Sequence, residues 1–379
     1  MCYAPRLVQR QIKKLWLALL IIFLLLSSCS RKSVSALERK GIRVTRRATP
    51  IDVGAKTDSL QIQYLGCGGL YIRQPGQSIM IDPFFSHQGI FKLAKSVLLG
   101  GKVRVKPSAL RFGKSRVLDS LHLDDSKLQQ ETKAVFSAHG HYDHLLDVPF
   151  VFDRWLGKQA DVYVNTSGYN TCFHCITQGK LHDMEPSMST RHRQGRSIDF
   201  NAPDGSVMKV YPILAAHNPH SANIKFFSGA VMCPLPHFDK PEAKTRANEW
   251  LEGRTLAFLI DIEKAGRIAF RMFVQSSSCH YPDGLPPQSF LDQKPVDLAI
   301  LGAASYHFSE ATYPCAFLED LKAQKVMYIH WEDFFRSYKR KPKSVLQTDL
   351  PRFFKCIVPN CKPAEYILPA PGVVVNVRY

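Results

Sequence analysis

The sequence has few acidic residues, no long apolar segment and no short repeats. Its 379 residues include 32 Asp and Glu against 50 Lys and Arg, which gives a formal net charge of +18. The longest apolar run, residues 15–26, is shorter than the roughly twenty residues that a membrane-spanning helix needs. The absence of repeats and low-complexity tracts excludes a fibrous protein, and a hydrophobic content of 45% excludes a mostly disordered chain. The length allows one large or two medium domains.

The basic charge is concentrated at the N-terminus. Residues 1–49 contain eleven Lys and Arg residues and a single acidic residue, Glu38. Much of the positive charge therefore belongs to a leader segment and not to the body of the protein. The sequence also lacks the interleaved aromatic and basic motifs of RNA-binding proteins. We therefore expect no nucleic-acid partner.

The first 28 residues have the regions of a secretory signal. A basic segment with Arg6, Arg10, Lys13 and Lys14 precedes the apolar run. The sequence Leu26-Ser27-Ser28-Cys29 then resembles a bacterial lipobox, which implies a signal peptide at 1–28 and a diacylglycerol on Cys29. Residues 29–58 would form a basic tether beside anionic headgroups. The expected location is the bacterial cell envelope, lipid-anchored on the periplasmic or outer-membrane side. The alternative is an uncleaved anchor with an incidental cysteine.

Export would allow disulfide bonds among the remaining cysteines. Eight of the ten cysteines remain after Cys2 and Cys29 are set aside. Cys356 and Cys361 lie in one short loop and are close enough in sequence to pair. Cys172 and Cys175 have the spacing of half a zinc site, but no second half accompanies them. Several free, buried thiols are the alternative.

Strands and helices alternate from residue 59 onward. The apolar patterns predict helices at 146–156 and 316–323, and a helix-prone, basic insertion at 87–130. The predicted strands are 61–65, 70–73, 78–82, 134–137, 161–165, 207–215, 256–262, 268–275, 297–301, 326–329 and 372–377. Hairpins followed by interleaved helices indicate an α/β (α+β) protein with a mixed sheet system.

The strongest chemical signal is the string His139-Gly-His141-Tyr-Asp143-His144, which directly follows an apolar strand. It places four side chains that can bind a metal within six residues. Imidazole and carboxylate are the ligands of zinc sites in which one position stays open for water. The alternative is a histidine-rich surface loop, but this order of residues fits a metal site much better.

This string resembles the HxHxDH signature of the metallo-β-lactamase superfamily. Further segments match that family in the expected order: a hairpin at 64–72, Asp82-Pro83 after a strand, His217 after a strand, and His330-Trp-Glu-Asp after a late strand. The last segment resembles the branch of N-acyl-phosphatidylethanolamine-hydrolysing phospholipase D and the sugar-lactone hydrolases. The resemblance implies a four-layer αββα sandwich formed by residues 59–379.

The resemblance also implies the roles of individual residues. His139, His141 and His217 would form a first metal site, and Asp143, His144 and His330 a second one, for one or two Zn²⁺ ions. Asp143 would also orient the nucleophilic water and is the expected catalytic residue. Asp82 would support the ligand loop through hydrogen bonds. We expect His220 to be a solvated loop residue.

One position departs from the family pattern. The family has an aspartate that bridges both metals, and Ser276 stands at that place, in a stretch without acidic residues. A hydroxyl is a poor bridging ligand. Three outcomes are open: a single metal, a substitute ligand from Cys279, His280 or Asp283, or a protein that binds without turnover. Asp261 is expected at the surface or in a hairpin.

Three functions remain open from the sequence. The first is a metal-dependent hydrolase of a phosphodiester or phospholipid, for which the basic segment 336–343 would face an anionic group, unless it is a solvated loop. The second is a lactonase or other carbonyl-ester hydrolase at the same site. The third is a non-catalytic, lipid-anchored protein that binds a metal or another ligand. Residues 89–100 are amphipathic and would lie either in a membrane interface or against the core.

Overall fold

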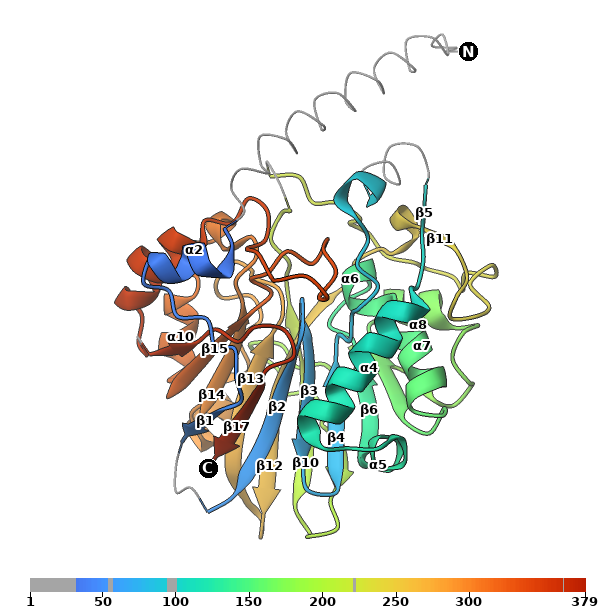
Figure 1. The fold of residues 1–379 in the computed structure, drawn as a ribbon. Coiled ribbons are helices and arrows are strands. Elements are labelled where there is room, and N and C mark those ends of the chain that lie inside the picture. The colour runs from blue at the N-terminus through green and yellow to red at the C-terminus, as the bar shows by residue number, and fades with distance from the viewer. Residues whose placement is uncertain (1–31, 54–56, 94–100, 221–222, 364) are drawn as a thin grey trace.

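Two large β-sheets packed face to face form the centre of the molecule (Figure 1). The computed structural model describes residues 32–53, 57–93, 101–220, 223–363 and 365–379. The expected signal peptide and Cys29 lie outside the described residues, so their roles stay predictions. Within the described residues, no helix has the length and apolar character needed to cross a membrane.

The first sheet has eight strands in the order β1-β17-β2-β3-β4-β6-β7-β8. The neighbours from β17 to β4 are antiparallel, whereas β4, β6, β7 and β8 run parallel. Its strands are β1 (Thr49–Asp52), β2 (Ser59–Gly66), β3 (Gly69–Gln74), β4 (Gln77–Ile81), β6 (Thr132–Phe136), β7 (Asp161–Val164), β8 (Leu181–Asp183) and β17 (Val374–Arg378).

The second sheet has seven strands in the order β16-β15-β14-β13-β12-β10-β9. Its strands are β9 (Ile198–Asn201), β10 (Val207–Ala215), β12 (Thr255–Lys264), β13 (Arg267–Gln275), β14 (Leu298–Gly302), β15 (Lys325–Ile329) and β16 (Tyr366–Ile367). The short strands β5 (Lys102–Val103) and β11 (Thr245–Arg246) pair with each other outside both sheets. Every predicted strand is confirmed, with ends shifted by a few residues. Six further strands were not predicted because their apolar patterns are too short: β1, β5, β8, β9, β11 and β16.

Helices cover the outer face of each sheet (Figure 1). On the first sheet these are α4 (Pro107–Leu121), α5 (Asp125–Glu131), α6 (Tyr142–Leu145), α7 (Val148–Phe150), the π-helix η1 (Val151–Trp155) and α8 (Thr166–Cys172). On the second sheet they include α9 (Gln288–Gln293), α10 (Cys315–Leu321), α11 (Leu350–Arg352) and the π-helix η5 (Phe353–Ile357). Single turns complete the chain: η2 (Glu185–Ser187), η3 (Ala247–Glu249), η4 (Tyr306–Phe308) and η6 (Val358–Asn360). The four-layer αββα sandwich is thereby confirmed.

The hydrophobic core lies between and outside the sheets because buried strands present apolar side chains on both faces. Between the sheets, Ile62 and Phe136 pack with Phe258 and Ile260 from the opposite sheet. On the outer face of the first sheet, Leu110 and its neighbours on α4 pack with Val135 and Tyr71. The predicted helix at 146–156 is confirmed as a helical region but is divided between α7 and η1, and the helix at 316–323 corresponds to α10.

Three predictions about the framework need correction. The tether was expected to reach residue 58, but from Lys32 onward it packs on the domain: α2 (Val34–Arg39) buries Leu37, and β1 pairs with β17. Apolar residues spaced among the basic ones explain this packing. Cys361 is bonded to Cys315, which is distant in sequence, and Cys356 is exposed and unpaired within the described residues. Asp261 is buried, because the Arg271 side chain pairs with it through two hydrogen bonds of 2.7 Å.

Candidate metal centre

The loops that carry the candidate ligands meet at one edge of the sandwich. They follow the ends of β2, β4, β6, β10, β13 and β15, which the strand register brings to the same edge. His139 lies in the loop after β6, and His141 is the N-cap residue directly before α6. A Cβ atom on Gly140 would approach the carbonyl oxygen of Leu251 to 2.2 Å, so only glycine fits between the two histidines. The string His139 to His144 is therefore bent into a tight loop against the strand that follows residue 251.

His139, His141 and His217 form the first group of candidate ligands. Each offers a ring nitrogen, and these atoms all lie within 4.8 Å of one another. Nε2 of His139 is 2.9 Å from Nδ1 of His141. Two nitrogen ligands at roughly 2.0–2.1 Å from a tetrahedral zinc are about 3.3 Å apart, so this spacing suits a shared cation. The three predicted residues are thus brought together.

Asp143, His144 and His330 form the second group, together with a residue that we did not predict, Cys67. Oδ2 of Asp143 is 3.8 Å from Nε2 of His144 and 3.8 Å from Nε2 of His330. The Cys67 sulfur is 3.6 Å from the same carboxylate oxygen and 3.2 Å from Nε2 of His330. The rings of His139 and His144 are 4.0 Å apart, so the two groups are direct neighbours.

The protonation states of most of these histidines fit cation binding. Burial lowers the pKa of His139, His141 and His330, and the neighbouring histidines lower it further. Burial also lowers the pKa of His217, to about 4. For His144 burial acts in the same direction, but the carboxylates of Asp82 and Asp143 outweigh it and raise the pKa. Several buried ring nitrogens have no hydrogen-bond partner among the described residues: Nδ1 of His139, Nε2 of His141, Nε2 of His144 and Nδ1 of His330. Neutral imidazoles bind divalent cations, so the lowered pKa values of His139, His141, His217 and His330 favour cation binding, whereas the raised pKa of His144 opposes it.

Two buried groups hold the ligand loops in place. Asp82 accepts a hydrogen bond of 2.8 Å from the backbone N–H of Ala138, and its second oxygen lies 2.8 Å from Nδ1 of His144. This agrees with the supporting role expected for Asp82. On the other side of the site, Glu332 accepts hydrogen bonds from the backbone N–H of Cys67, at 2.6 Å, and from the hydroxyl of Tyr64. Such outer interactions orient metal ligands.

Three residues of the site have a left-handed backbone although none is glycine. The φ angles are +53° at Cys67, +45° at Asp82 and +54° at His330. Each follows the end of a strand, and each turns its side chain toward the centre. Such conformations cost free energy and persist where the surrounding structure enforces them, which is common at functional sites.

Ser276 lies where β13 ends, buried and beside the second group. A Cβ atom on Gly68 would come within 2.8 Å of both the Ser276 Cβ and Cε1 of His144, so Gly68 and Ser276 are packed together next to that ligand. The Ser276 hydroxyl has no hydrogen-bond partner among the described residues. None of the three expected substitutes joins either group: His280 and Asp283 are exposed, and the Cys279 thiol contacts the Asp283 backbone.

His220 was expected in solvent, and this is wrong. Its ring lies 4.7 Å from that of His217 and 5.2 Å from that of His141, and Nδ1 accepts a hydrogen bond from the Phe226 backbone. The turn formed by residues 217–220 folds back over the first group. His220 therefore lies in the wall of the site, although it belongs to neither ligand group.

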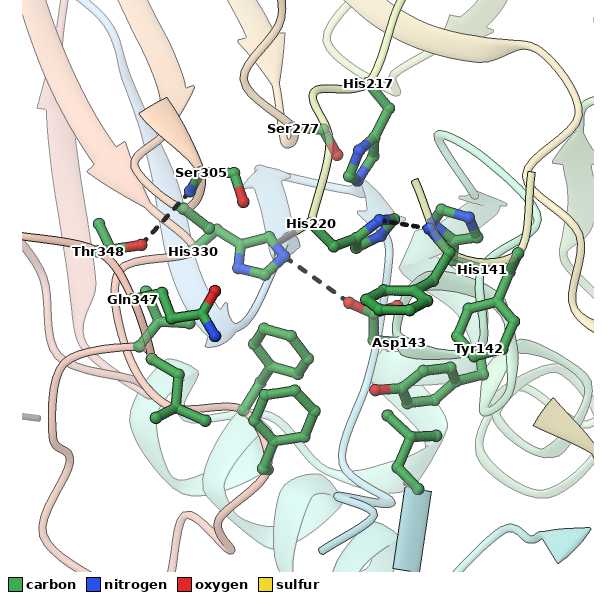
Figure 2. A pocket seen from close by; sticks show the side chains of 18 of the residues that line it. His141, Tyr142, Asp143, His217, His220, Ser277, Ser305, His330, Gln347 and Thr348 are labelled. Carbon is green, nitrogen blue, oxygen red and sulfur yellow. Dashed lines mark hydrogen bonds and ion pairs between the residues drawn. The ribbon is translucent and has the colours of Figure 1, made fainter. Parts of the chain in front are cut away.

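The site opens into a pocket with largely apolar walls (Figure 2). Figure 2 shows the imidazoles of His141, His217 and His330 directed into it, with Ser277 beside His217. The apolar lining residues are Ile90, Leu93, Phe226, Phe227, Ala304, Phe334, Phe335, Val345 and Leu346. The polar lining residues other than the histidines are Tyr142, Asp143, Ser277, Ser278, Ser305, Gln347 and Thr348. Within the described residues no Lys or Arg lines this pocket, so the basic segment at 336–343 does not reach it.

Sequence reasoning missed Cys67, Glu332 and Ser277. Cys67 stands in the turn Gly66-Cys67-Gly68-Gly69 between two buried strands, and a reactive side chain among three glycines was the available signal. Glu332 is the third residue of the His330-Trp-Glu-Asp segment, so its place near the site followed from that segment. Ser277 had no signal besides its neighbour Ser276.

Comparisons with known proteins give distant structural likenesses only. No family model matches the chain, and no curated protein matches it. Igni18, a metallo hydrolase from Ignicoccus hospitalis, has 13% identity and a TM-score of 0.45, with 85% of this chain and 99% of that chain covered. The metallo-β-lactamase fold protein YhfI from Bacillus subtilis has 13% identity and a TM-score of 0.38, with 72% and 86% covered. An isothiocyanate hydrolase from Delia radicum gut bacteria has 13% identity and a TM-score of 0.41, with 83% and 98% covered. We therefore infer the function from the geometry of the site itself.

Proposed function

We propose that this protein is a metal-dependent hydrolase of a substrate that carries an apolar chain, with a phospholipid or other phosphodiester as the first candidate. The observation that carries this proposal is the position of the two ligand groups at the floor of an apolar pocket. His139, His141 and His217 would hold one divalent cation. Asp143, His144 and His330 would contribute to the binding of a second. Zn²⁺ is the expected ion because imidazole and carboxylate ligands suit it.

The chemistry divides between the cation and the side chains around it. A divalent cation bound there lowers the pKa of a water molecule and withdraws charge from a substrate oxygen. Asp143 would orient that water through its carboxylate, the role expected for it from the sequence. The Ser277 hydroxyl is buried, lacks a partner among the described residues and lines the pocket, so it would donate a hydrogen bond to the substrate. The aromatic walls would exclude bulk water from the reacting bond.

The apolar character of the substrate follows from the walls of the pocket. Phe226, Phe227, Phe334 and Phe335 supply much of the wall. Phe91 is 60% exposed and Ile224 is 48% exposed, two of the few large apolar side chains that the described surface leaves in contact with water. Phe91 directly follows the lining residue Ile90, and Ile224 stands two positions before the lining residue Phe226. An acyl chain would cover this surface, and the lipid anchor proposed at Cys29 would bring the pocket close to a membrane in the bacterial cell envelope.

A phosphodiester is the first candidate because two neighbouring cations would concentrate positive charge beside a phosphoryl centre, where negative charge must be stabilised in the transition state. A carboxylic ester or lactone is the second candidate. It is favoured by the lack of Lys and Arg among the described lining residues, since an anionic headgroup is commonly held by such side chains. An enzyme for an uncharged ester would have no need of them.

A comparison of substrates tests the proposal. The purified full-length protein would be assayed with bis-p-nitrophenyl phosphate, with a phosphatidylethanolamine in mixed micelles, and with p-nitrophenyl esters of two and eight carbons, before and after chelation. We expect cation-dependent hydrolysis that favours the longer or lipid substrate, and the ratio of the phosphodiester to the ester rates identifies the bond. Bound metal without turnover of any substrate would support the non-catalytic function and contradict this one.

A further inference from the structure

Cys67 belongs to the second ligand group, which has no carboxylate at the strand end where Ser276 stands. Its sulfur is 3.2 Å from Nε2 of His330 and 3.6 Å from Oδ2 of Asp143. A thiolate at roughly 2.3 Å and a nitrogen or oxygen at roughly 2.0–2.2 Å from one tetrahedral zinc are about 3.5 Å apart. Both measured separations agree with that value. Cys67 therefore has the position of a fourth ligand, supplied by the turn after β2 and not by the strand end at Ser276.

The backbone around Cys67 is held by the same groups that hold His330. The hydroxyl of Tyr64 accepts a hydrogen bond of 2.8 Å from the His330 backbone, donates its one hydrogen to Glu332, and lies 3.1 Å from the Cys67 carbonyl oxygen. Glu332 accepts from the Cys67 backbone N–H, from Tyr64 and, at 2.9 Å, from the hydroxyl of Tyr338. One buried network thus fixes two side chains that are 263 residues apart in the sequence. Such a network is expected around a ligand whose position matters, and a packing cysteine has no need of it.

The close packing of Gly68 gives a second reason for this arrangement. A side chain at residue 68 would collide with His144, Ser276 and an Asp82 oxygen, each at 2.8–2.9 Å from its Cβ atom. The turn therefore lies directly against the second group, and the preceding residue points its sulfur into it. Because the side chain of Ser276 is small, the backbone of Gly68 can pack directly against it.

We propose that Cys67 is a thiolate ligand of the second metal site, which thereby has four protein ligands: Cys67, Asp143, His144 and His330. This proposal rests on the metal dependence proposed above and extends it. Zinc sites with four protein ligands are coordinatively closed, whereas catalytic sites have three and keep a position open. The first group, with three histidines, is then the site at which water is activated. The second is a closed site that supplies positive charge and positions Asp143.

A thiolate also changes which metal the second site selects. Soft sulfur ligands favour zinc over manganese or magnesium, while the histidine site accepts a wider range of divalent ions. The two sites of the wild-type protein should therefore differ in metal preference. With Mn²⁺ as the only ion we expect the second site to remain weakly occupied because of its thiolate.

The test uses the purified full-length protein, loaded with zinc and freed of excess metal. Elemental analysis should give two zinc ions per chain in the wild type and one in Cys67→Ser. The matched control is Cys279→Ser, because Cys279 is also a buried free thiol but lies outside both groups, and it should keep two. X-ray absorption should show a zinc–sulfur distance of about 2.3 Å in the wild type and in the control. A titration of the wild type with Co²⁺ should give a sulfur-to-metal charge-transfer band and needs no variant.

The outcomes separate this inference from the proposed function. A wild type that holds zinc without any zinc–sulfur contact, or a Cys67→Ser variant that keeps both ions, would overturn the assignment of Cys67 and leave the metal-dependent hydrolase standing. A wild type that binds no divalent metal would instead overturn the proposed function, and this inference with it. If Cys67→Ser loses one zinc ion and the zinc–sulfur contact while Cys279→Ser keeps both, Cys67 is established as the ligand.

Discussion

Asp82 and His144 form a buried pair in which a carboxylate oxygen lies 2.8 Å from Nδ1 of the imidazole. Because Nδ1 faces Asp82, the opposite nitrogen, Nε2, faces Asp143 and the rest of the second group. The pair therefore decides which nitrogen of His144 is available to a metal. Asp82 also binds the backbone of Ala138, so one side chain orients both a ligand and the loop before it.

We predict that Asp82→Asn weakens metal binding at the second group about 10- to 100-fold, the usual effect of removing a carboxylate that orients a histidine ligand. The amide can still accept the hydrogen bond from Ala138, so the fold should persist. Competition with a chromophoric chelator would measure the affinity. The control is Asp161→Asn, which removes the carboxylate of a similar pair with His182, 2.8 Å apart and remote from the site. Equal affinities in both variants would show that Asp82 does not act on the ligand.

Removing the hydroxyl of Ser277 should impair substrate binding and leave metal binding intact. A hydrogen bond to substrate contributes about 0.5–1.5 kcal/mol, so Ser277→Ala should lower kcat/KM by roughly 2- to 12-fold. Because the hydroxyl has no partner among the described residues, its removal should not lower the melting temperature. Steady-state kinetics on the best substrate would check this, with the exposed Ser126→Ala as the control. An unchanged kcat/KM would mean that Ser277 does not contact the substrate.

The buried pair of Arg271 and Asp261 predicts a large loss of stability when one partner is removed. Asp261→Ala leaves the guanidinium buried without its carboxylate and should lower the free energy of unfolding by about 3–5 kcal/mol. Replacing both residues, as Asp261→Leu with Arg271→Met, should restore much of that loss because no charge remains buried. Urea denaturation of the wild type and the two variants measures the difference. A single variant as stable as the wild type would contradict a net role for this pair.

His87 predicts a dependence of stability on pH. Burial lowers its pKa to about 4, below the value near 6.5 in the unfolded chain. The native protein then binds fewer protons than the unfolded chain between these values. Its stabilising contribution is therefore complete above about pH 6.5 and is lost as the pH falls toward 4. The difference amounts to about 2–3 kcal/mol at pH 4.5.

His87→Asn should remove this component because asparagine does not titrate, while its amide can donate to the Phe334 carbonyl that His87 Nδ1 contacts at 2.8 Å. Urea unfolding at pH 4.5 and 7.5, with a chelator present throughout, measures the change. Asp147, whose pKa burial raises to about 6, has the opposite effect but is common to both proteins and cancels in the comparison. Parallel pH profiles for wild type and variant would refute the prediction.

Local sequence patterns were enough to predict the strands and one loop of the site. Continuous apolar runs such as those of β6 and β15 identify buried strands because every side chain of such a strand meets a neighbouring layer. The His139 to His144 string places its ligands within one short loop, so their proximity follows from chain connectivity alone. His217 and His330 were predicted through the family resemblance, and the structure brings them into the same two groups.

Other features depend on how the two sheets pack, which no short segment specifies. Asp261 looked like a surface residue until Arg271, on the adjacent strand, was seen to be buried with it. The basic residues among 32–53 predicted a tether. In the structure most of these basic side chains are exposed, but apolar residues between them are buried against the domain. In both cases a partner distant from the local pattern determines whether the polar residues face the solvent.

The sequence by itself determined that the chain forms alternating strands and helices and that a histidine-rich loop ends one of the strands, because both properties depend on neighbours a few residues apart. Only the tertiary structure decided which side chains complete the site. Cys67 and His330 come from turns at the ends of different sheets, and the apolar pocket combines residues from 90 to 348. These contacts exist because burial of the faces of both sheets aligns the strand ends at one edge, and that alignment is a property of the packed sandwich as a whole.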